Sequence, residues 1–454
     1  MIQLKKYALL FVIIVCASAK AQEATNSNFS LQQSIEFAIK NSPNHLNAEL
    51  DQQNAEYRRK EIAGLGLPQI TGSVDFKNYI EIPTSLFPES AFNPFAGPDD
   101  YLAVKFGLKY NATAGVSASQ LLFSSDYIFG LKASKEFINL SRISVTRSKA
   151  DLVAQVSKAY YNVIINRDRI KLLEANVVKL KKIYEDTKAF NKQGFAELID
   201  VERLEVQYNN LITEKDKTVK LIGLSETMLK FQMGYKLSDP IVLTDSLNVV
   251  TNFEELNISK IDVSQRPEYL LLQAQQNLLE MDVKRLKWGY LPTLAAYGSY
   301  QYNTQRATTN IFESDKNNAM KQWYPIALVG ITLNLNIFDG LQRHNKIKQA
   351  QISSLKNQNT LKTIQQGGEL EATVAAISYN NAYSTLLIQK KNMEMASHVY
   401  DVVQEKFKQG VGSNSEIINA ETSLKEAQTN YYNAVYDMLV FKIDYQKAIG
   451  TLVK

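Results

Sequence analysis

Cysteine is almost absent from this 454-residue sequence, because the single cysteine, Cys16, lies close to the start of the chain. It stands within an apolar stretch, residues 7–19, that follows two lysines and leads into the small-residue pattern Ala19-Lys20-Ala21. This arrangement predicts a secretory signal peptide over residues 1–21. Removal of the signal would leave a mature chain without thiols, which excludes disulfides as a source of its stability.

Cys16 leaves one alternative open, because a cysteine after an apolar signal core can be a lipid-attachment site. Lipoprotein signals usually place a small residue directly before that cysteine, whereas here the preceding residue is Val15. We therefore favour the interpretation of Cys16 as an ordinary signal residue.

Long apolar runs and a large charge imbalance are also missing. Beyond the signal, no apolar run reaches the roughly 18 residues of a membrane-spanning helix. A mean hydropathy of −0.23 is too polar for a helical membrane protein. Signal removal lowers the net charge from +5 to +2, because it takes away Lys5, Lys6 and Lys20. With no basic cluster either, we expect no nucleic-acid partner.

The motifs of catalysis and of metal or nucleotide binding are missing as well. His45, His344 and His398 lie far apart in the sequence, and none has a cysteine or histidine partner at metal-ligand spacing. No G-x-x-x-x-G-K loop or G-x-S-x-G elbow occurs, and the pair Gly367-Gly368 stands within a predicted helix. We therefore expect no enzyme activity, no bound metal and no cofactor.

What the sequence does contain is an internal repeat. Ser42-Pro43 and Leu65-Gly66-Leu67-Pro68 correspond to Arg266-Pro267 and Trp288-Gly289-Tyr290-Leu291-Pro292, at an offset of 224 residues. In each copy a helical run follows the first proline, and alternation of polar and apolar residues follows the second. The chain is therefore predicted to consist of two homologous halves.

Strict alternation of polar and apolar residues predicts two strands in each half. The predicted strands cover about residues 69–82, 102–122, 293–303 and 325–338. Tyr101, Trp323 and Tyr324 stand near strand ends, as aromatic residues do at membrane interfaces. A soluble antiparallel sandwich would alternate equally well, but nothing else in the chain supplies a second sheet. We therefore interpret these segments as membrane strands.

The longest predicted segments are helical. No proline occurs between Gly340 and Lys408, and apolar residues recur there at spacings near three and four, which predicts roughly 100 Å of continuous helix. Glycines at positions 194 and 410 indicate sharp turns, so we predict helical hairpins over about residues 124–234 and 340–449. Their narrow apolar stripes favour antiparallel coiled coils over a compact bundle.

These elements predict a mainly α-helical fold with a membrane β-barrel. We place a first structural repeat over residues 22–238 and a second over residues 239–454. Each subunit would contribute two hairpins but only four strands. Four strands cannot close a barrel, and open sheet edges would leave backbone groups unpaired in lipid. Several subunits must therefore share one pore.

The order of these pieces resembles the TolC family of outer-membrane efflux ducts, which act in tripartite efflux or type I secretion. Residues 31–43 are similar to the opening helix of the family, Phe338-Asp339-Gly340 to its strand-to-helix junction, and residues 448–452 to its closing element. The resemblance implies a homotrimer with a 12-stranded barrel in outer-membrane lipid and a helical tunnel in the periplasm. It also implies two partners, a periplasmic adaptor protein and an inner-membrane pump, with the duct itself conducting passively.

The resemblance further implies that the tunnel closes at the tips of the helical hairpins. Asp200 and Glu416 follow the two turns at positions that are acidic in the family, so we expect them to be the tip carboxylates. The turns themselves, at Gly194, Gly410 and Gly412, are the expected docking sites for the adaptor. Three copies of Glu416 around a narrow pore would repel one another and attract cations.

Three residues depart from the family pattern. Phe407 stands where a tyrosine is frequent, Gly412 where an arginine is common, and Asn419 where a second acidic residue can stand. Without that hydroxyl and guanidinium, the usual hydrogen bonds between the hairpins cannot form. We expect apolar packing around Phe407 to replace them.

One alternative function stays open, namely a periplasmic or surface coiled-coil protein whose strands do not enter lipid. The exported substrate is not indicated, and drugs, amphiphiles, peptides and secreted proteins all fit. Methionine and histidine do not cluster, which argues weakly against dedicated metal export.

Overall fold

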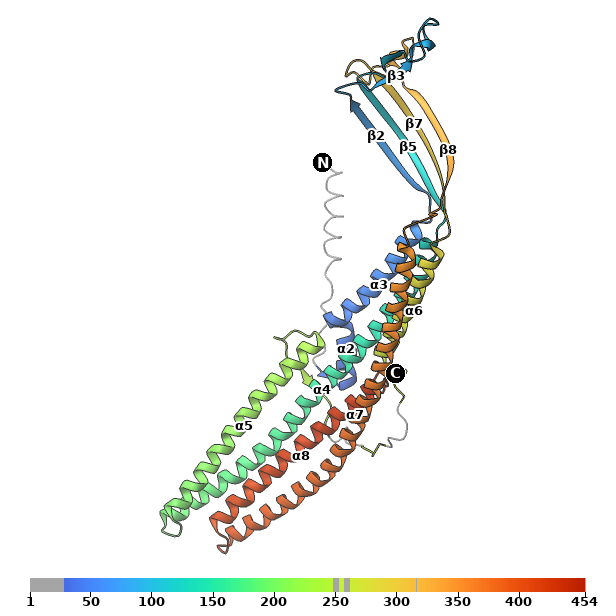
Figure 1. The fold of residues 1–454 in the computed structure, drawn as a ribbon. Helices are drawn as coiled ribbons and strands as arrows, with labels where there is room; N and C mark the ends of the chain where they lie inside the picture. Colours follow the sequence, from blue (N-terminus) through green and yellow to red (C-terminus); the bar gives the residue numbers. More distant parts are fainter. Residues whose placement is uncertain (1–27, 248–252, 257–261, 316, 454) are drawn as a thin grey trace, which may run out of the picture. The chain divides into compact units, whose positions relative to one another are not determined.

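The computed structural model describes residues 28–247, 253–256, 262–315 and 317–453 (Figure 1). The predicted signal peptide, residues 1–21, lies outside the described residues. The chain divides into two compact units. The sheet unit comprises Asp51–Arg142 and Leu271–Leu361, and the helical unit comprises the described residues of Met1–Leu50, Ile143–Leu270 and Lys362–Lys454.

The sheet unit contains a four-stranded antiparallel sheet in the order β2-β5-β7-β8 (Figure 1). Its strands are β2 (Gln69–Asn78), β5 (Tyr110–Phe123), β7 (Thr293–Arg306) and β8 (Tyr324–Asn334). Gln69 is paired with Ser119, and Thr293 with Asn334. The two central strands, β5 and β7, therefore come from different halves of the sequence.

The expectation of one continuous strand over residues 102–122 is wrong. Tyr101–Lys105 forms a separate strand, β4, which pairs with β3 (Thr84–Pro88) in a two-stranded sheet of its own. Between β4 and β5, Gly107 has a φ of +110°, a conformation that interrupts extended backbone and favours glycine. The side-chain alternation continues through this interruption, so the pattern could not reveal it.

The other strand boundaries differ by a few residues from the expected ones. β2 ends at Asn78 rather than at residue 82, because its last bond to the neighbouring segment runs from the N–H of Tyr79 to the carbonyl of Lys109 (2.8 Å), directly before β5. β7 continues to Arg306 and β8 already ends at Asn334. The connections between strands also contain two short 3-10 helices, η1 (Glu89–Ala91) and η3 (Ala319–Lys321).

The long helices form two hairpins (Figure 1). The first consists of α4 (Ser125–Lys192) and α5 (Leu198–Met233), and the second of α7 (Gln342–Lys408) and α8 (Asn414–Ala448). At the turns, Gly194 has a φ of +81° and Gly410 a φ of +75°. Both values lie in the left-handed region, which a helix end reaches most readily with glycine.

In the described part of the chain, three shorter helices accompany the hairpins: α2 (Leu31–Asn41), α3 (Pro43–Gly64) and α6 (Pro267–Trp288). Ser30 and Gln33 form a capping box at the start of α2. The order α3-β2-β5-α4-α5 recurs as α6-β7-β8-α7-α8, while the division between repeats at residue 238 stays a prediction. Among the helices that the structure describes, none is both long enough and apolar enough to cross a membrane.

The core of the helical unit consists mainly of two apolar clusters. The first surrounds Tyr160 and packs α4, α5 and α8 around a short parallel pair, β1 (Asn28–Phe29) and β6 (Val242–Leu243). The second, which we name the hairpin cluster, joins all four hairpin helices. Its buried members are Leu173, Leu180, Ile183, Leu204, Leu211, Tyr400, Ile417, Ala420 and Leu424. The two hairpins of one chain are therefore packed together rather than independent.

One of the two glycines in the middle of α7 makes room for an arginine. A Cβ atom at Gly368 would lie 3.1 Å from Nη1 of Arg266, which is nearly buried. The Arg266 guanidinium pairs with Glu371 on α7 at 2.6 Å. The close passage of this side chain across the helix explains why residue 368 has no side chain.

Candidate functional site

The four-stranded sheet has one face that is almost entirely apolar. The strand register aligns the following residues on it: Ile70, Gly72, Val74 and Phe76 on β2; Ala112, Ala114, Val116 and Ala118 on β5; Leu294, Ala296, Gly298, Tyr300 and Tyr302 on β7; Ala327, Val329, Ile331 and Leu333 on β8. Val74 is 82% exposed and Val329 is 91% exposed. A continuous apolar face of this kind is unfavourable in water and matches the surface that membrane strands present to lipid.

The opposite face of the sheet is polar and internally bonded. The hydroxyl groups of Thr71 and Ser117 lie 2.7 Å apart, and Nδ2 of Asn303 donates to Asn111 and Thr113 at 2.9 Å each. These bonds cross from β2 to β5 and from β7 to β5, so the polar face is ordered across three strands. Such a face fits contact with water.

On the same polar face two large side chains cover glycines of the neighbouring strand. The ring of Tyr297 lies over Gly330, where an added Cβ would be 2.7 Å from its Cζ atom. Gln301 covers Gly115 in the same way, with its Cβ 2.4 Å from the position of an added Cβ. A larger residue at 330 would displace the ring of Tyr297, whereas one at 115 would also clash with the β7 backbone, 2.6 Å from Cα of Gln301.

Both outer strands of the sheet have an open edge. β2 pairs only with β5, and β8 pairs only with β7, among the residues that the structure describes. The backbone N–H and C=O groups along the other side of each strand therefore have no strand partner. In lipid such groups could not bond to water, so a sheet in that environment would require further strands at both edges.

The hairpins likewise expose apolar residues on their outer helices. In Figure 1, α4 and α8 lie between α5 and α7, and α4 forms ion pairs with α5 (Arg167–Glu226, 2.7 Å) and with α8 (Lys158–Asp444, 2.5 Å). Exposed apolar residues recur at helical spacing on the two outer helices: Leu221, Leu224, Met228 and Phe231 on α5; Leu370, Val374, Ile377, Met395, Val399 and Val402 on α7. These two stripes are suited to helix packing against a further partner.

At the hairpin tips, Asp200 is bonded to a residue that the sequence did not single out. Nδ2 of Asn414, near the start of α8, donates to the backbone carbonyl of Asp200 at 2.9 Å and to its carboxylate at 3.1 Å. Asn414 is buried and its Oδ1 atom has no partner among the described residues. On the other side, Arg203 lies 4.0 Å from the Asp200 carboxylate. A polar contact thus connects the first hairpin with the second.

The other expected tip residues have different surroundings. Glu416 is exposed, and its backbone N–H donates to the hydroxyl of Ser413, the N-cap of α8, at 3.2 Å. Asn419 is also exposed. Neither the carboxylate of Glu416 nor the amide of Asn419 is bonded to another described residue. The structure therefore brings Asp200 together with Asn414 rather than with Glu416 or Asn419.

Phe407 is partly buried and packs against the hairpin cluster, together with Val403 and Ile418. The apolar contact expected around Phe407 is therefore present, and it lies between the two hairpins. This apolar contact accompanies the Asp200–Asn414 hydrogen bonds, so it does not replace every polar contact between the hairpins.

Gly412 has a steric role in the second turn. The N–H groups of Val411 and Gly412 both donate to the carbonyl of Lys406, at 3.1 and 3.2 Å, which folds the chain back on itself. A Cβ atom at Gly412 would lie 2.9 Å from the backbone nitrogen of Phe407. Any side chain at this position would require the turn to shift.

A groove runs beside the tips between α5 and α8. It has a volume of about 490 Å³ and is lined by Ile199, Glu202, Arg203, Val206, Gln207, Ser415 and Ile418. Ile199 and Val206 are exposed, as are Phe195 and Val411 in the two turns. The groove combines apolar walls with one acidic and one basic side chain, a composition suited to a protein partner.

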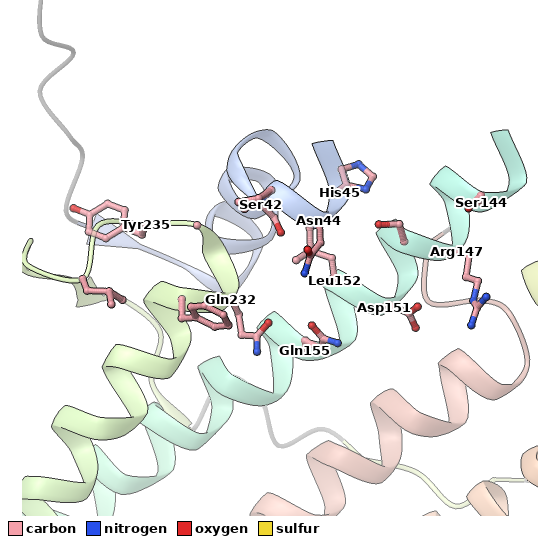
Figure 2. A pocket seen from close by; sticks show the side chains of 15 residues that line it. Ser42, Asn44, His45, Ser144, Arg147, Asp151, Leu152, Gln155, Gln232 and Tyr235 are labelled. Carbon is pink, nitrogen blue, oxygen red and sulfur yellow. The ribbon is translucent and has the colours of Figure 1, made fainter. Parts of the chain in front are cut away.

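A larger cavity, of about 750 Å³, lies at the other end of α5, between α4 and the start of α3 (Figure 2). Two of its charged residues already have partners, because Asp151 pairs with Lys447 at 2.6 Å and Arg147 lies 3.5 Å from Glu268. His45 also lines it and is almost fully buried. No group of three potential metal ligands occurs among the described residues.

Comparison with solved structures defines the class of fold. The chain matches the Campylobacter jejuni CmeC outer membrane channel with a TM-score of 0.71 and 15% identity, over 93% of this chain and 85% of that chain. It matches the open state of the Neisseria gonorrhoeae MtrE outer membrane channel with a TM-score of 0.72 and 13% identity, over 93% and 89%. The architecture is that of outer membrane channel proteins.

Sequence comparison points to related proteins of the same kind. Residues 264–451 match the model of the outer membrane efflux protein family. The chain is 20% identical to outer membrane protein TolC of Vibrio cholerae, over 75% of this chain and 77% of that protein. It is 21% identical to TolC of Escherichia coli, over 76% and 71%. In sequence as well as in fold, the chain is similar to TolC-like outer membrane efflux proteins.

Proposed function

We propose that three copies of this chain form an outer-membrane channel that passively conducts substrates from an inner-membrane pump and a periplasmic adaptor to the cell exterior. One observation carries the proposal: the sheet is apolar on one face, polar on the other and unpaired at both edges. An apolar outer wall, a wet inner wall and free edges are what one segment of a larger barrel requires.

Closure of the barrel follows from the two free strands. If β8 of one copy pairs with β2 of the next, the backbone groups along both edges are satisfied, and no edge remains when the ring closes. Three copies supply twelve strands. A ring of this size is wide enough to hold an aqueous lumen lined by the polar face.

The helical unit supports the same ring. The exposed stripes of α5 and α7 lie on the two outer helices, so α7 of one copy can pack against α5 of the next. Residues such as Leu224 and Phe231, exposed by 65% and 68% in one chain, would then be covered. A continuous helical tunnel is the expected result.

We assign the hairpin tips to gating and to docking of the adaptor. The Asp200–Asn414 bonds and the packing of Phe407 hold the two hairpins of a chain together, while Glu416 remains exposed for contact with ions in the pore. The turns at Gly194, Gly410 and Gly412 and the groove beside them, with Glu202 and Arg203, form the proposed docking surface for the adaptor. The duct needs no cofactor for this role.

The test is to purify the full chain from outer membranes in detergent, image the particle, and record currents after insertion into planar bilayers. We expect a threefold particle that resists dissociation until heated and forms discrete channels. A water-soluble monomer without channel activity would contradict the proposal and would favour a structural coiled-coil protein.

A further inference from the structure

A carboxylic acid is buried among apolar residues between the hairpins. Glu421 lies on α8 and is only 4% exposed. On the same helix Ile417, Ala420 and Leu424 are buried members of the hairpin cluster. The Oε1 atom of Glu421 has no hydrogen-bond partner among the described residues. A charged carboxylate in such a place is costly, because at Oε1 neither water nor a donor compensates for the lost hydration.

The ionisable groups around Glu421 do little to stabilise its charge. From its own helix, Lys425 favours the charged form, but burial outweighs this effect and raises the pKa of Glu421. From α7, the buried phenol of Tyr400 faces the site, and burial together with the charges of Glu421 and Asp401 raises the pKa of Tyr400 to about 12. The phenol is therefore a neutral neighbour at physiological pH.

The two remaining hairpin helices, α4 and α5, contribute no unpaired positive charge to the described surroundings of Glu421. From α4, Lys179 lies over the ring of Tyr400, 5.5 Å from its centroid, but pairs with Asp401 at 3.2 Å. The ionisable residues of α4 and α5 that pack against the hairpin cluster are Tyr184 and Tyr208, whose rings stack on each other. The other α4 and α5 members of the cluster are aliphatic.

We propose that Glu421 is a proton-operated switch of hairpin packing, in which the protonated acid permits close packing of the four helices and the ionised carboxylate loosens it. The packed state binds the proton more tightly than an exposed carboxyl does. The stability of the packed state is therefore at its maximum below the ordinary pKa of glutamate and declines as the pH rises through the raised pKa of Glu421.

Glu421 lies close enough to the hairpin tips for loosening of the helices around it to affect the tips. It lies seven residues after Asn414, which is about 10 Å along the helix axis. Loosening of the hairpin cluster at Glu421 would also release the bonds from Asn414 to Asp200. In the duct that we propose above, this would favour tip opening at higher pH. That last consequence, but not the switch itself, rests on the proposed function.

The experiment compares hydrogen–deuterium exchange of the full-length protein in detergent with that of Glu421→Gln, a neutral side chain of the same shape. At each pH we take the ratio of wild-type to variant exchange for peptides covering residues 410–424, which cancels the intrinsic pH dependence of exchange. We expect a ratio near one in acid, a rise of up to about tenfold for each pH unit between the ordinary pKa of glutamate and the raised pKa of Glu421, and a plateau above that raised pKa. Glu426→Gln, an exposed glutamate on the same helix, is the matched control and should give a ratio that does not change with pH.

Infrared difference spectroscopy of the wild-type protein provides a second measurement that does not depend on folding of the variant. The carbonyl stretch of a protonated carboxylic acid should persist above the pH at which ordinary glutamates ionise, and it should be lost in Glu421→Gln. A ratio independent of pH, or titration of the band at an ordinary glutamate pKa, would overturn the switch. A protein that shows the switch but forms no channels would overturn the proposed function alone.

Discussion

Asn414 on α8 and Asp200 on α5 are joined by two hydrogen bonds from one amide nitrogen, at 2.9 and 3.1 Å. The two residues are 214 positions apart, and each lies within the first turn of the helix that returns from a hairpin tip. The bonds therefore connect the hairpins at the place where the first tip carboxylate was expected.

Replacement of Asn414 by alanine removes both bonds and leaves the partly buried Asp200 without its donor. We expect the tip to lose about 1–3 kcal/mol of local stability. Hydrogen exchange of residues 198–204 and 410–418 measures the effect. Asn419→Ala, an exposed asparagine without bonded partners, is the control and should change local stability by less than about 0.5 kcal/mol. Equal exchange in the two variants would show that the Asn414 bonds contribute nothing.

Phe407 offers a test of apolar packing at the tip. Phe407→Ala should destabilise the tip by about 2 kcal/mol, roughly half the cost for a fully buried phenylalanine, because the ring is only partly covered. Phe407→Leu retains most of the contact and should cost less than about 1.5 kcal/mol. The channels of the alanine variant should open more often in bilayer recordings. Identical open probabilities in wild type and both variants would contradict a gating role for this ring.

Glu416 is exposed and free for contact with ions. If three copies line a narrow pore, Glu416→Gln removes three carboxylates, each of which attracts a unit positive charge 4 Å away by about 1 kcal/mol even in bulk water. We expect block by divalent cations to weaken by at least about tenfold. Single-channel recordings with increasing cation concentration measure this directly. Unchanged conductance and block would remove Glu416 from the pore.

Neighbouring residues on β8 distinguish a lipid-facing from a water-facing sheet. Val329 belongs to the apolar face and Leu328 to the polar one. Val329→Lys should destabilise a membrane strand by about 2–4 kcal/mol and reduce the yield of trimers in the outer membrane. Leu328→Lys introduces the same side chain toward the lumen and should be tolerated. In a soluble sheet Leu328→Lys would be the more destabilising of the two changes, or the two would be equal, since Val329 is the more exposed residue.

The polar and apolar periodicity of the strands correctly predicted which side chains lie on which face of the sheet. The alternation around Val74 and Val329 correctly separates the two faces, because a strand places successive side chains on opposite sides. It failed at Gly107, where the backbone turns while the alternation continues. The hairpin turns were visible in the sequence because Gly194 and Gly410 adopt a conformation that favours glycine.

The contacts at the tips were less accessible to sequence reasoning. No local pattern indicates which polar side chain of α8 reaches across to α5, so Asn414 was missed although its neighbour Glu416 was named. Glu421 was missed because a glutamate within a helix is usually exposed. Its position between Ala420 and Leu424, both within the apolar stripe of α8, was the available signal. Burial of a polar residue depends on helix packing, which one sequence does not specify.

The bonds between Asn414 and Asp200 lie within one chain, so in the proposed trimer each protomer would hold its tip with its own pair of bonds. Release of these bonds in one protomer would not require their release in the other two. We therefore expect the aperture to widen in steps, with sublevels of current between the shut and the fully conducting state, rather than in a single concerted transition.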